Sequence, residues 1–256
     1  MQSTTEVKAS FRLLVLASLL TLALWFIPFA GVIAWPVRLF VTLIHESGHA
    51  LAALATWGNV QRITLDWSGN GLTFFSGGWG WVVINAGYLS TLLFGCGLLL
   101  VLRRARYART AAIFTAVLVL LMTVLFGGNL VAWATGLFFG VGVLLLALKA
   151  KPNVTHFVMS FLAVQCVLNA LFDLVVLLVL SSKTDALTDA QIMAARTDGL
   201  IPAIVWALGW SAVAVAMLGT TLMIYFRSLR QRAEMAEPMI PHLLPDHASD
   251  MARPHL

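Results

Sequence analysis

About seven long apolar runs dominate this chain of 256 residues and constrain its fold more than any other feature. A helix needs about 20 mostly apolar residues to cross the hydrocarbon layer of a membrane. Runs of that order, bounded by charged or turn-forming residues, cover residues 11–33, 35–57, 81–102, 110–126, 130–148, 154–180 and 200–226. Because 60% of the residues are hydrophobic and only 11% are charged, we exclude a water-soluble globular enzyme.

We expect these runs to be helical. A helix satisfies its backbone polar groups within its own segment, whereas a membrane barrel needs short alternating strands that this pattern lacks. The sequence therefore predicts an all-α polytopic membrane protein with about seven transmembrane helices, in a membrane-embedded domain of residues 1–226. Residues 227–256, which contain Pro and His, are expected to form a disordered tail.

The net charge of +5 comes from 16 Lys and Arg residues against 11 acidic residues. The basic residues are scattered at the ends of the apolar runs and do not form one patch. That distribution is typical of charges that set the orientation of helices in a lipid bilayer, and we expect no nucleic-acid partner.

The connection at residues 59–78 has a different pattern. Apolar and polar residues alternate over 63–67, a turn signal follows at 68–71, and a second short apolar stretch covers 72–75. The pattern predicts a small β-hairpin directly after the second helix.

The later connection at residues 181–199 is polar and acidic. Within it, residues 187–195 are expected to form a short amphipathic surface helix, capped by Thr188 or Asp189.

Of the 11 acidic residues, only Glu46 and Asp173 fall inside predicted membrane helices, which makes each a candidate functional residue. Glu46 belongs to the H-E-x-x-H motif His45-Glu46-Ser47-Gly48-His49, whose two imidazoles lie one helical turn apart on the same face. That spacing suits two ligands of a Zn²⁺ ion, with Glu46 placed to take a proton from a zinc-activated water. The alternative is a buried polar cluster that serves helix packing or a proton path.

Asp173 is the candidate for the third zinc ligand. The second and sixth predicted helices run parallel, so their polar residues can meet at a similar depth. Asn169 lies one turn before Asp173 on the same face, where its amide could orient the carboxylate, a water or a substrate carbonyl. Alternatively, Asp173 is a lone membrane carboxylate that is protonated or paired with Asn169.

Taken together, these features resemble the site-2 protease family of intramembrane zinc metalloproteases, particularly its small bacterial branch. The resemblance is carried by the H-E-x-x-H motif, the following hairpin, Asn85-Ala86-Gly87-Tyr88 and the Asn169/Asp173 pair. It implies zinc on His45, His49 and Asp173, Glu46 as the general base, and a location in a bacterial cell membrane. The family usually has Pro before the third ligand and Gly after it, where this chain has Phe172 and Leu174.

Hydrolysis of a peptide bond within a bilayer needs an unwound substrate, because a helix hides its carbonyl groups in hydrogen bonds. An exposed strand of the hairpin can pair with an extended substrate. The candidate substrate-binding residues are Ile63, Thr64, Leu65 and Asp66 on the first strand and Thr73, Phe74 and Phe75 on the second. The alternative is a hairpin that only packs at the level of the lipid headgroups.

The sequence thus predicts a zinc-dependent protease whose substrate is a membrane-embedded or membrane-adjacent protein. Two alternatives stay open: a non-proteolytic scaffold that retains the metal site, and an ion or proton transporter that uses Glu46 and Asp173 as a relay. The orientation also stays open. The excess of Lys and Arg after the third and fifth runs places the hairpin outside the cytoplasm, whereas the resemblance implies a site nearer the cytosol.

Overall fold

The computed structural model describes residues 30–183 and 188–234, together with Arg12, Val15, Leu16, Ser18 and Leu19. The described elements are α2 (Ala30–Ala55), β1 (Asn59–Leu65), β2 (Gly71–Ser76), α3 (Gly80–Leu102), the short 3₁₀ helix η1 (Ala105–Tyr107), α4 (Ala108–Phe126), α5 (Leu130–Lys149), α6 (Pro152–Lys183), α7 (Asp189–Ala195) and α8 (Ala203–Glu234). Most of the first predicted span lies outside the described residues.

The predicted class, an all-α polytopic membrane protein with a small hairpin after the second helix, is confirmed. Five helical segments in the described part of the chain are long and apolar enough to cross a membrane: Gly80–Leu102, Ala105–Phe126, Leu130–Lys149, Pro152–Ser182 and Ala203–Ser228. The predicted span at 35–57 corresponds to α2, whose polar motif residues lower its mean hydropathy, so that it is not among the five. Helix α8 continues to Glu234, into the segment expected as a disordered tail, and residues 235–256 lie outside the described residues.

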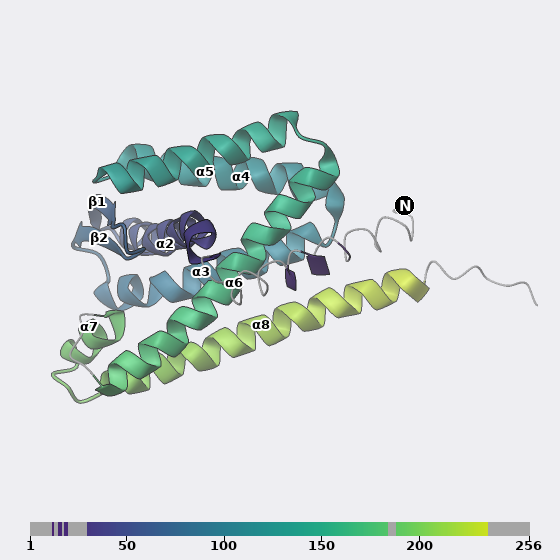
Figure 1. Cartoon of the computed structure of the whole chain (residues 1–256). Coiled ribbons are helices and arrows are strands. Elements are labelled where there is room, and N and C mark those ends of the chain that lie inside the picture. Colours follow the sequence, from purple (N-terminus) through teal and green to yellow (C-terminus); the bar gives the residue numbers. More distant parts are fainter. Residues whose placement is uncertain (1–11, 13–14, 17, 20–29, 184–187, 235–256) are drawn as a thin grey trace, which may run out of the picture.

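The helices pack around a central pair, α2 and α3 (Figure 1). Helices α4 and α5 form an antiparallel hairpin on one side, and the long α6 crosses the bundle to reach α8 on the other side. Phe40 and Leu43 of α2, Val83 of α3 and Met159 of α6 are fully buried between these helices. Apolar side chains such as Phe138 lie on the outside, as expected of helices that face lipid.

The β-hairpin lies beside α2 at one side of the bundle (Figure 1), and its turn reaches back to the N-terminal half of α2, where the Trp35 ring stacks on Trp67. Strands β1 and β2 pair antiparallel, from Asn59 opposite Ser76 to Leu65 opposite Gly71. The connection between α4 and α5 covers the other edge of β1, because Gly128 N–H donates to the Ile63 carbonyl at 2.8 Å. In the described part of the chain, β2 pairs only with β1, so its outer edge is free.

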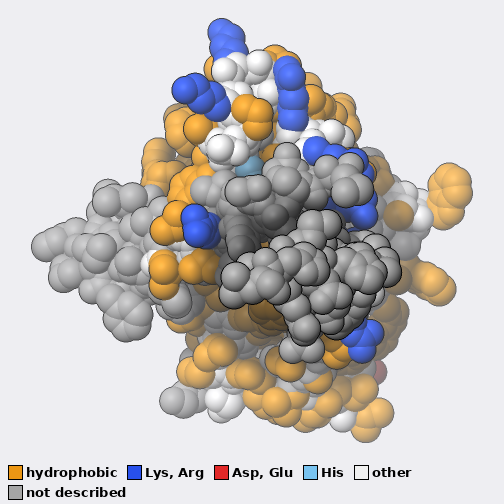
Figure 2. All heavy atoms as spheres, turned by 90° about the vertical axis from the view of Figure 1, so that its right-hand side faces the viewer, with side chains coloured by type: hydrophobic (Ala, Val, Ile, Leu, Met, Phe, Trp, Pro, Cys, Tyr) orange, Lys and Arg blue, Asp and Glu red, His pale blue; other side chains and the backbone are white. Residues whose placement is uncertain are grey.

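The opposite end of the bundle carries the predicted excess of basic residues. Figure 2 shows this face, where Lys and Arg side chains stand out on a mainly hydrophobic surface. The α3–α4 and α5–α6 connections at this end contribute Arg103, Arg104, Arg106, Lys149 and Lys151. The hairpin and α7 are therefore separated from the arginine-rich end by the length of the bundle (Figure 1).

Candidate metal and active site

Two histidines of α2 point toward each other in a cavity of about 560 Å³ that opens between α2, β2, α3, α6 and α7. His45 and His49 lie one turn apart, as the H-E-x-x-H spacing predicts, and their Nε2 atoms are 3.1 Å apart. His49 is buried, and the side chain of His45 is 17% exposed to the cavity.

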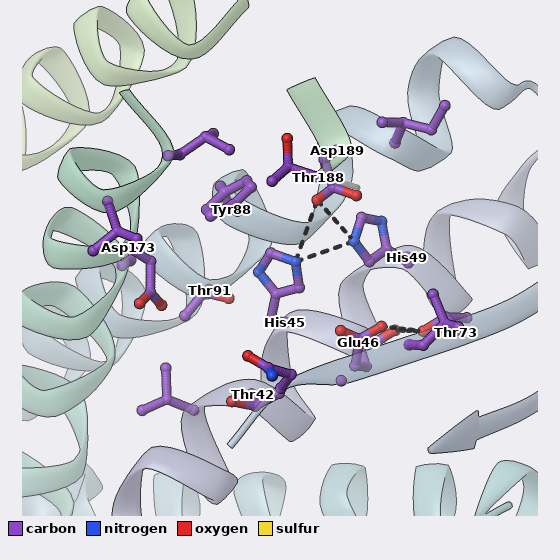
Figure 3. A pocket seen from close by; sticks show the side chains of 18 of the residues that line it. Thr42, His45, Glu46, His49, Thr73, Tyr88, Thr91, Asp173, Thr188 and Asp189 are labelled. Atoms are coloured by element: carbon purple, nitrogen blue, oxygen red, sulfur yellow. Dashed lines mark hydrogen bonds and ion pairs between the residues drawn. The ribbon is translucent and has the colours of Figure 1, made fainter. Parts of the chain in front are cut away.

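A carboxylate from a different part of the chain completes this group (Figure 3). Asp189 Oδ2 lies 3.5 Å from His45 Nε2 and 3.3 Å from His49 Nε2. Ligand atoms about 2.0–2.1 Å from a tetrahedral Zn²⁺ ion are separated from each other by about 3.3 Å. The three separations therefore fit one tetrahedral metal ion with a fourth position left for water or substrate.

Asp189 begins α7, the short surface helix that the sequence predicts between α6 and α8. Thr188 is its N-cap, and the Thr188 hydroxyl accepts a hydrogen bond from the Gln191 N–H at 3.3 Å. Burial raises the pKa of Asp189, but hydrogen bonding to His45 and His49 outweighs this effect and holds the pKa below its usual value. The carboxylate is thus in the charged form that a metal ligand requires.

Helix α3 forms the wall behind the histidines. His49 Nδ1 lies 2.7 Å from the Val83 carbonyl, so Nδ1 carries a proton and Nε2 is the nitrogen that faces the cavity, where a metal ion would take the place of the Nε2 proton. Gly87 faces the same two rings: a Cβ atom at this position would lie 2.3 Å from His45 Nε2 and 2.4 Å from His49 Nε2. Only glycine leaves room here for both imidazoles in these positions.

Glu46 is buried below the histidines and contacts β2 (Figure 3). The Thr73 hydroxyl lies 2.6 Å from Glu46 Oε2 and 3.0 Å from the Glu46 carbonyl oxygen. Gly71 brings the strand close to the carboxylate, because a Cβ there would lie 2.6 Å from Oε1. Strand β2 therefore holds the Glu46 carboxylate beside the candidate metal ligands.

Asp173, the third ligand expected from the sequence, lines the same cavity from α6 but lies apart from the histidine–Asp189 group (Figure 3). Asn169 is turned to another partner: its Nδ2 donates to the carbonyl of Gln165 at 2.9 Å and to Gln165 Oε1 at 3.0 Å. The structure thus brings together His45, Glu46 and His49 with Asp189, and leaves Asp173 as a second carboxylate on the cavity wall.

The candidate substrate-binding residues of the two hairpin strands differ in whether they line the cavity. Thr73 and Phe75 of β2 line the cavity, as do Gly69, Asn70, Gly71 and Leu72 at the turn and the start of this strand. On β1, Ile63 and Leu65 are buried beneath the hairpin.

The other predicted hairpin residues do not line the cavity. Thr64 is partly buried on β1, and the Arg62 guanidinium lies 4.1 Å from the centre of the Phe74 ring. Asp66 is exposed at the turn, where hydrogen bonds from Ser68 and Asn70 lower its pKa. Of the two strands, only β2 thus lines the cavity.

One comparison with known proteins identifies a family. A family model described as Peptidase M50B-like matches residues 14–221, which include α2 to α7 and most of α8. No curated protein and no solved structure matches the chain.

Proposed function

The chain belongs to the Peptidase M50B-like family, and from this premise we propose that it is a zinc-dependent intramembrane protease. Its substrate is a membrane-embedded or membrane-adjacent protein. The family match confirms the resemblance to the site-2 proteases, and with five apolar helices the chain is an integral, multi-pass membrane protein. We place it in a bacterial cell membrane on the resemblance to the small bacterial branch.

The observation that carries the proposal is the spacing of three ligand atoms. His45 Nε2, His49 Nε2 and Asp189 Oδ2 lie 3.1 to 3.5 Å from one another, as the ligands of one tetrahedral ion do. Two imidazoles and one carboxylate are a common ligand set for catalytic zinc. Asp173 is the alternative third ligand, which α6 would have to bring closer to the histidines.

Zinc bound here would activate a water molecule and polarise the scissile carbonyl. Glu46 takes the proton from the attacking water and delivers it to the leaving amine. The Thr73 hydroxyl donates to Glu46 Oε2, which leaves Oε1 as the oxygen that accepts the proton. Burial of Glu46 and His49 excludes other water from this side of the cavity.

The free edge of β2 is the proposed substrate-binding element. An extended segment that pairs with Leu72 and its neighbours would run along the cavity wall beside Glu46. Strand β1 cannot do this, because the α4–α5 connection covers its other edge. Pairing with β2 would also supply backbone hydrogen bonds to a substrate segment that has left its helix.

The test is cleavage of a model transmembrane substrate by the purified chain in liposomes, with and without the Glu46→Gln substitution. We expect the variant to retain zinc and fold but to lose cleavage, because an amide cannot take the proton. Persistent cleavage by the variant refutes the mechanism. If the wild-type chain binds the substrate without changing its mass, the scaffold alternative holds. An ion flux that depends on membrane potential and not on zinc supports the relay.

A further inference from the structure

Asn85 of α3 lies where three helices meet next to the site. Its Oδ1 accepts a hydrogen bond from Trp210 Nε1 of α8. Its Nδ2 donates to the Trp81 carbonyl of its own helix at 2.5 Å and lies 4.0 Å from Met193 Sδ of α7. One amide side chain therefore contacts both α7 and α8.

Helix α7 depends on such contacts for its position. It has only 7 residues, and a helix this short is not stable in isolation. Its inner face, Ala190 and Met193, is fully buried. At its end, the Arg196 guanidinium lies against Gly80, since a Cβ on that glycine would be 2.3 Å from Arg196 Nη2. Helix α7 thus packs on α8 and on the first turns of α3.

Trp210, the partner of Asn85 on α8, is connected to His45 through the ring of Tyr88. The Trp210 ring stacks on Tyr88 with ring centres 5.6 Å apart. The Tyr88 ring meets His45 edge-on with ring centres 4.7 Å apart. Trp210 is buried, and its hydrogen bond to Asn85 fixes the position of its indole ring. The fixed indole in turn limits where the rings of Tyr88 and His45 can lie.

We propose that Asn85 is a positioning residue for the metal site: it holds α7, and with it Asp189, against the two histidines. The inference rests on the proposed function, in which Asp189 is a metal ligand. Distances from ligand to metal tolerate deviations of about 0.2 Å, so a small displacement of α7 weakens binding. Asn85 does not touch the metal group itself and acts only through α7 and Trp210.

The experiment measures the zinc affinity of the detergent-purified full chain by competition with a chelating indicator. We expect Asn85→Ala to bind zinc about 10- to 100-fold more weakly than the wild type, as when other groups that orient ligands are removed. Trp210→Phe, which removes the N–H donor and one of the two indole rings but keeps an aromatic ring, should also weaken zinc binding. The double variant should bind zinc no more weakly than Asn85→Ala, because both changes break the same hydrogen bond.

Asn129→Ala is the matched control. This asparagine also joins separate elements: it caps α5 and bonds to both the N–H and the carbonyl of Leu65 on β1. We expect Asn129→Ala to lower the melting temperature and to leave zinc affinity unchanged.

Wild-type zinc affinity in Asn85→Ala, with only a lower melting temperature, would overturn the positioning role. If Asn85→Ala does not fold, unchanged affinity in Trp210→Phe has the same meaning. The failure of the proposed function gives a different result: zinc is then absent from the wild type, or its affinity is unchanged in Asp189→Ala.

Discussion

A methyl group added at Gly87 tests the site without altering any ligand. In the Gly87→Ala variant, the new Cβ would lie 2.3 Å from His45 Nε2 and 2.4 Å from His49 Nε2, whereas ordinary contacts begin at 3.4 Å. Relief of these contacts requires the rings to move by roughly 1 Å, about five times the tolerance of a metal–ligand distance. We therefore expect zinc affinity to fall by at least about 100-fold, or about 2.7 kcal/mol of binding free energy. Cleavage of the model substrate should fall with it.

The matched control is Gly97→Ala on the same helix, where no atom lies within 4 Å of an added Cβ. This variant should bind zinc as the wild type does and gain up to about 1 kcal/mol of stability from the higher helix propensity of alanine. Zinc affinity is measured by indicator competition, and folding by the melting temperature in the same detergent. Wild-type zinc affinity in Gly87→Ala would refute the inference that both Nε2 atoms face one metal ion beside this glycine.

Three further predictions concern the base, the strand that holds it and the metal. Thr73→Val removes the hydroxyl that donates to Glu46, a hydrogen bond worth about 1.5–3 kcal/mol, so turnover should fall about 10- to 100-fold at unchanged zinc content. Thr73→Ser should restore turnover, and equal rates in all three chains would contradict the role of the hydroxyl. Gly71→Ala places a Cβ 2.6 Å from Glu46 Oε1, so this variant should cleave the substrate more slowly and retain its zinc. Cleavage and zinc content are measured on the same preparation. Wild-type turnover would argue against the close approach of β2 to Glu46. Removal of zinc with a chelator should lower the melting temperature, because free zinc at about 1,000 times its Kd stabilises the folded chain by about 4 kcal/mol. An unchanged melting temperature would mean that no metal stabilises the fold.

Much of the fold could be predicted because its elements have strong local signals. The spans expected at 81–102 and 130–148 differ from α3 and α5 by a residue at one end, since charged or turn residues bound these apolar runs. The hairpin was predicted from alternation and a turn signal, both of which depend on neighbouring residues. The α4–α5 connection that covers β1 could not be predicted, because it depends on contacts between residues distant in sequence.

The candidate site also contains residues that a local pattern predicts and one that only the packing of helices brings close. The H-E-x-x-H spacing places His45 and His49 together, because one helical turn fixes their separation. The sequence does not single out Asp189 as a ligand, because this residue begins a surface helix and so lacks the signal of a carboxylate inside a membrane span. The available signal was its position at the start of an amphipathic segment in an otherwise polar connection. Its distance from the histidines depends on how α7 packs on α3 and α8, which no local pattern specifies.

The most direct test of the account is the zinc content per chain of three proteins purified in detergent without chelators: the wild type, Asp189→Ala and Asp173→Ala. We predict about one zinc per chain in the wild type and in Asp173→Ala, and little or none in Asp189→Ala. Zinc retained in Asp189→Ala but lost in Asp173→Ala would place the third ligand on α6 and contradict the geometry proposed here. Absence of zinc from the wild type would contradict the assignment of a metalloprotease.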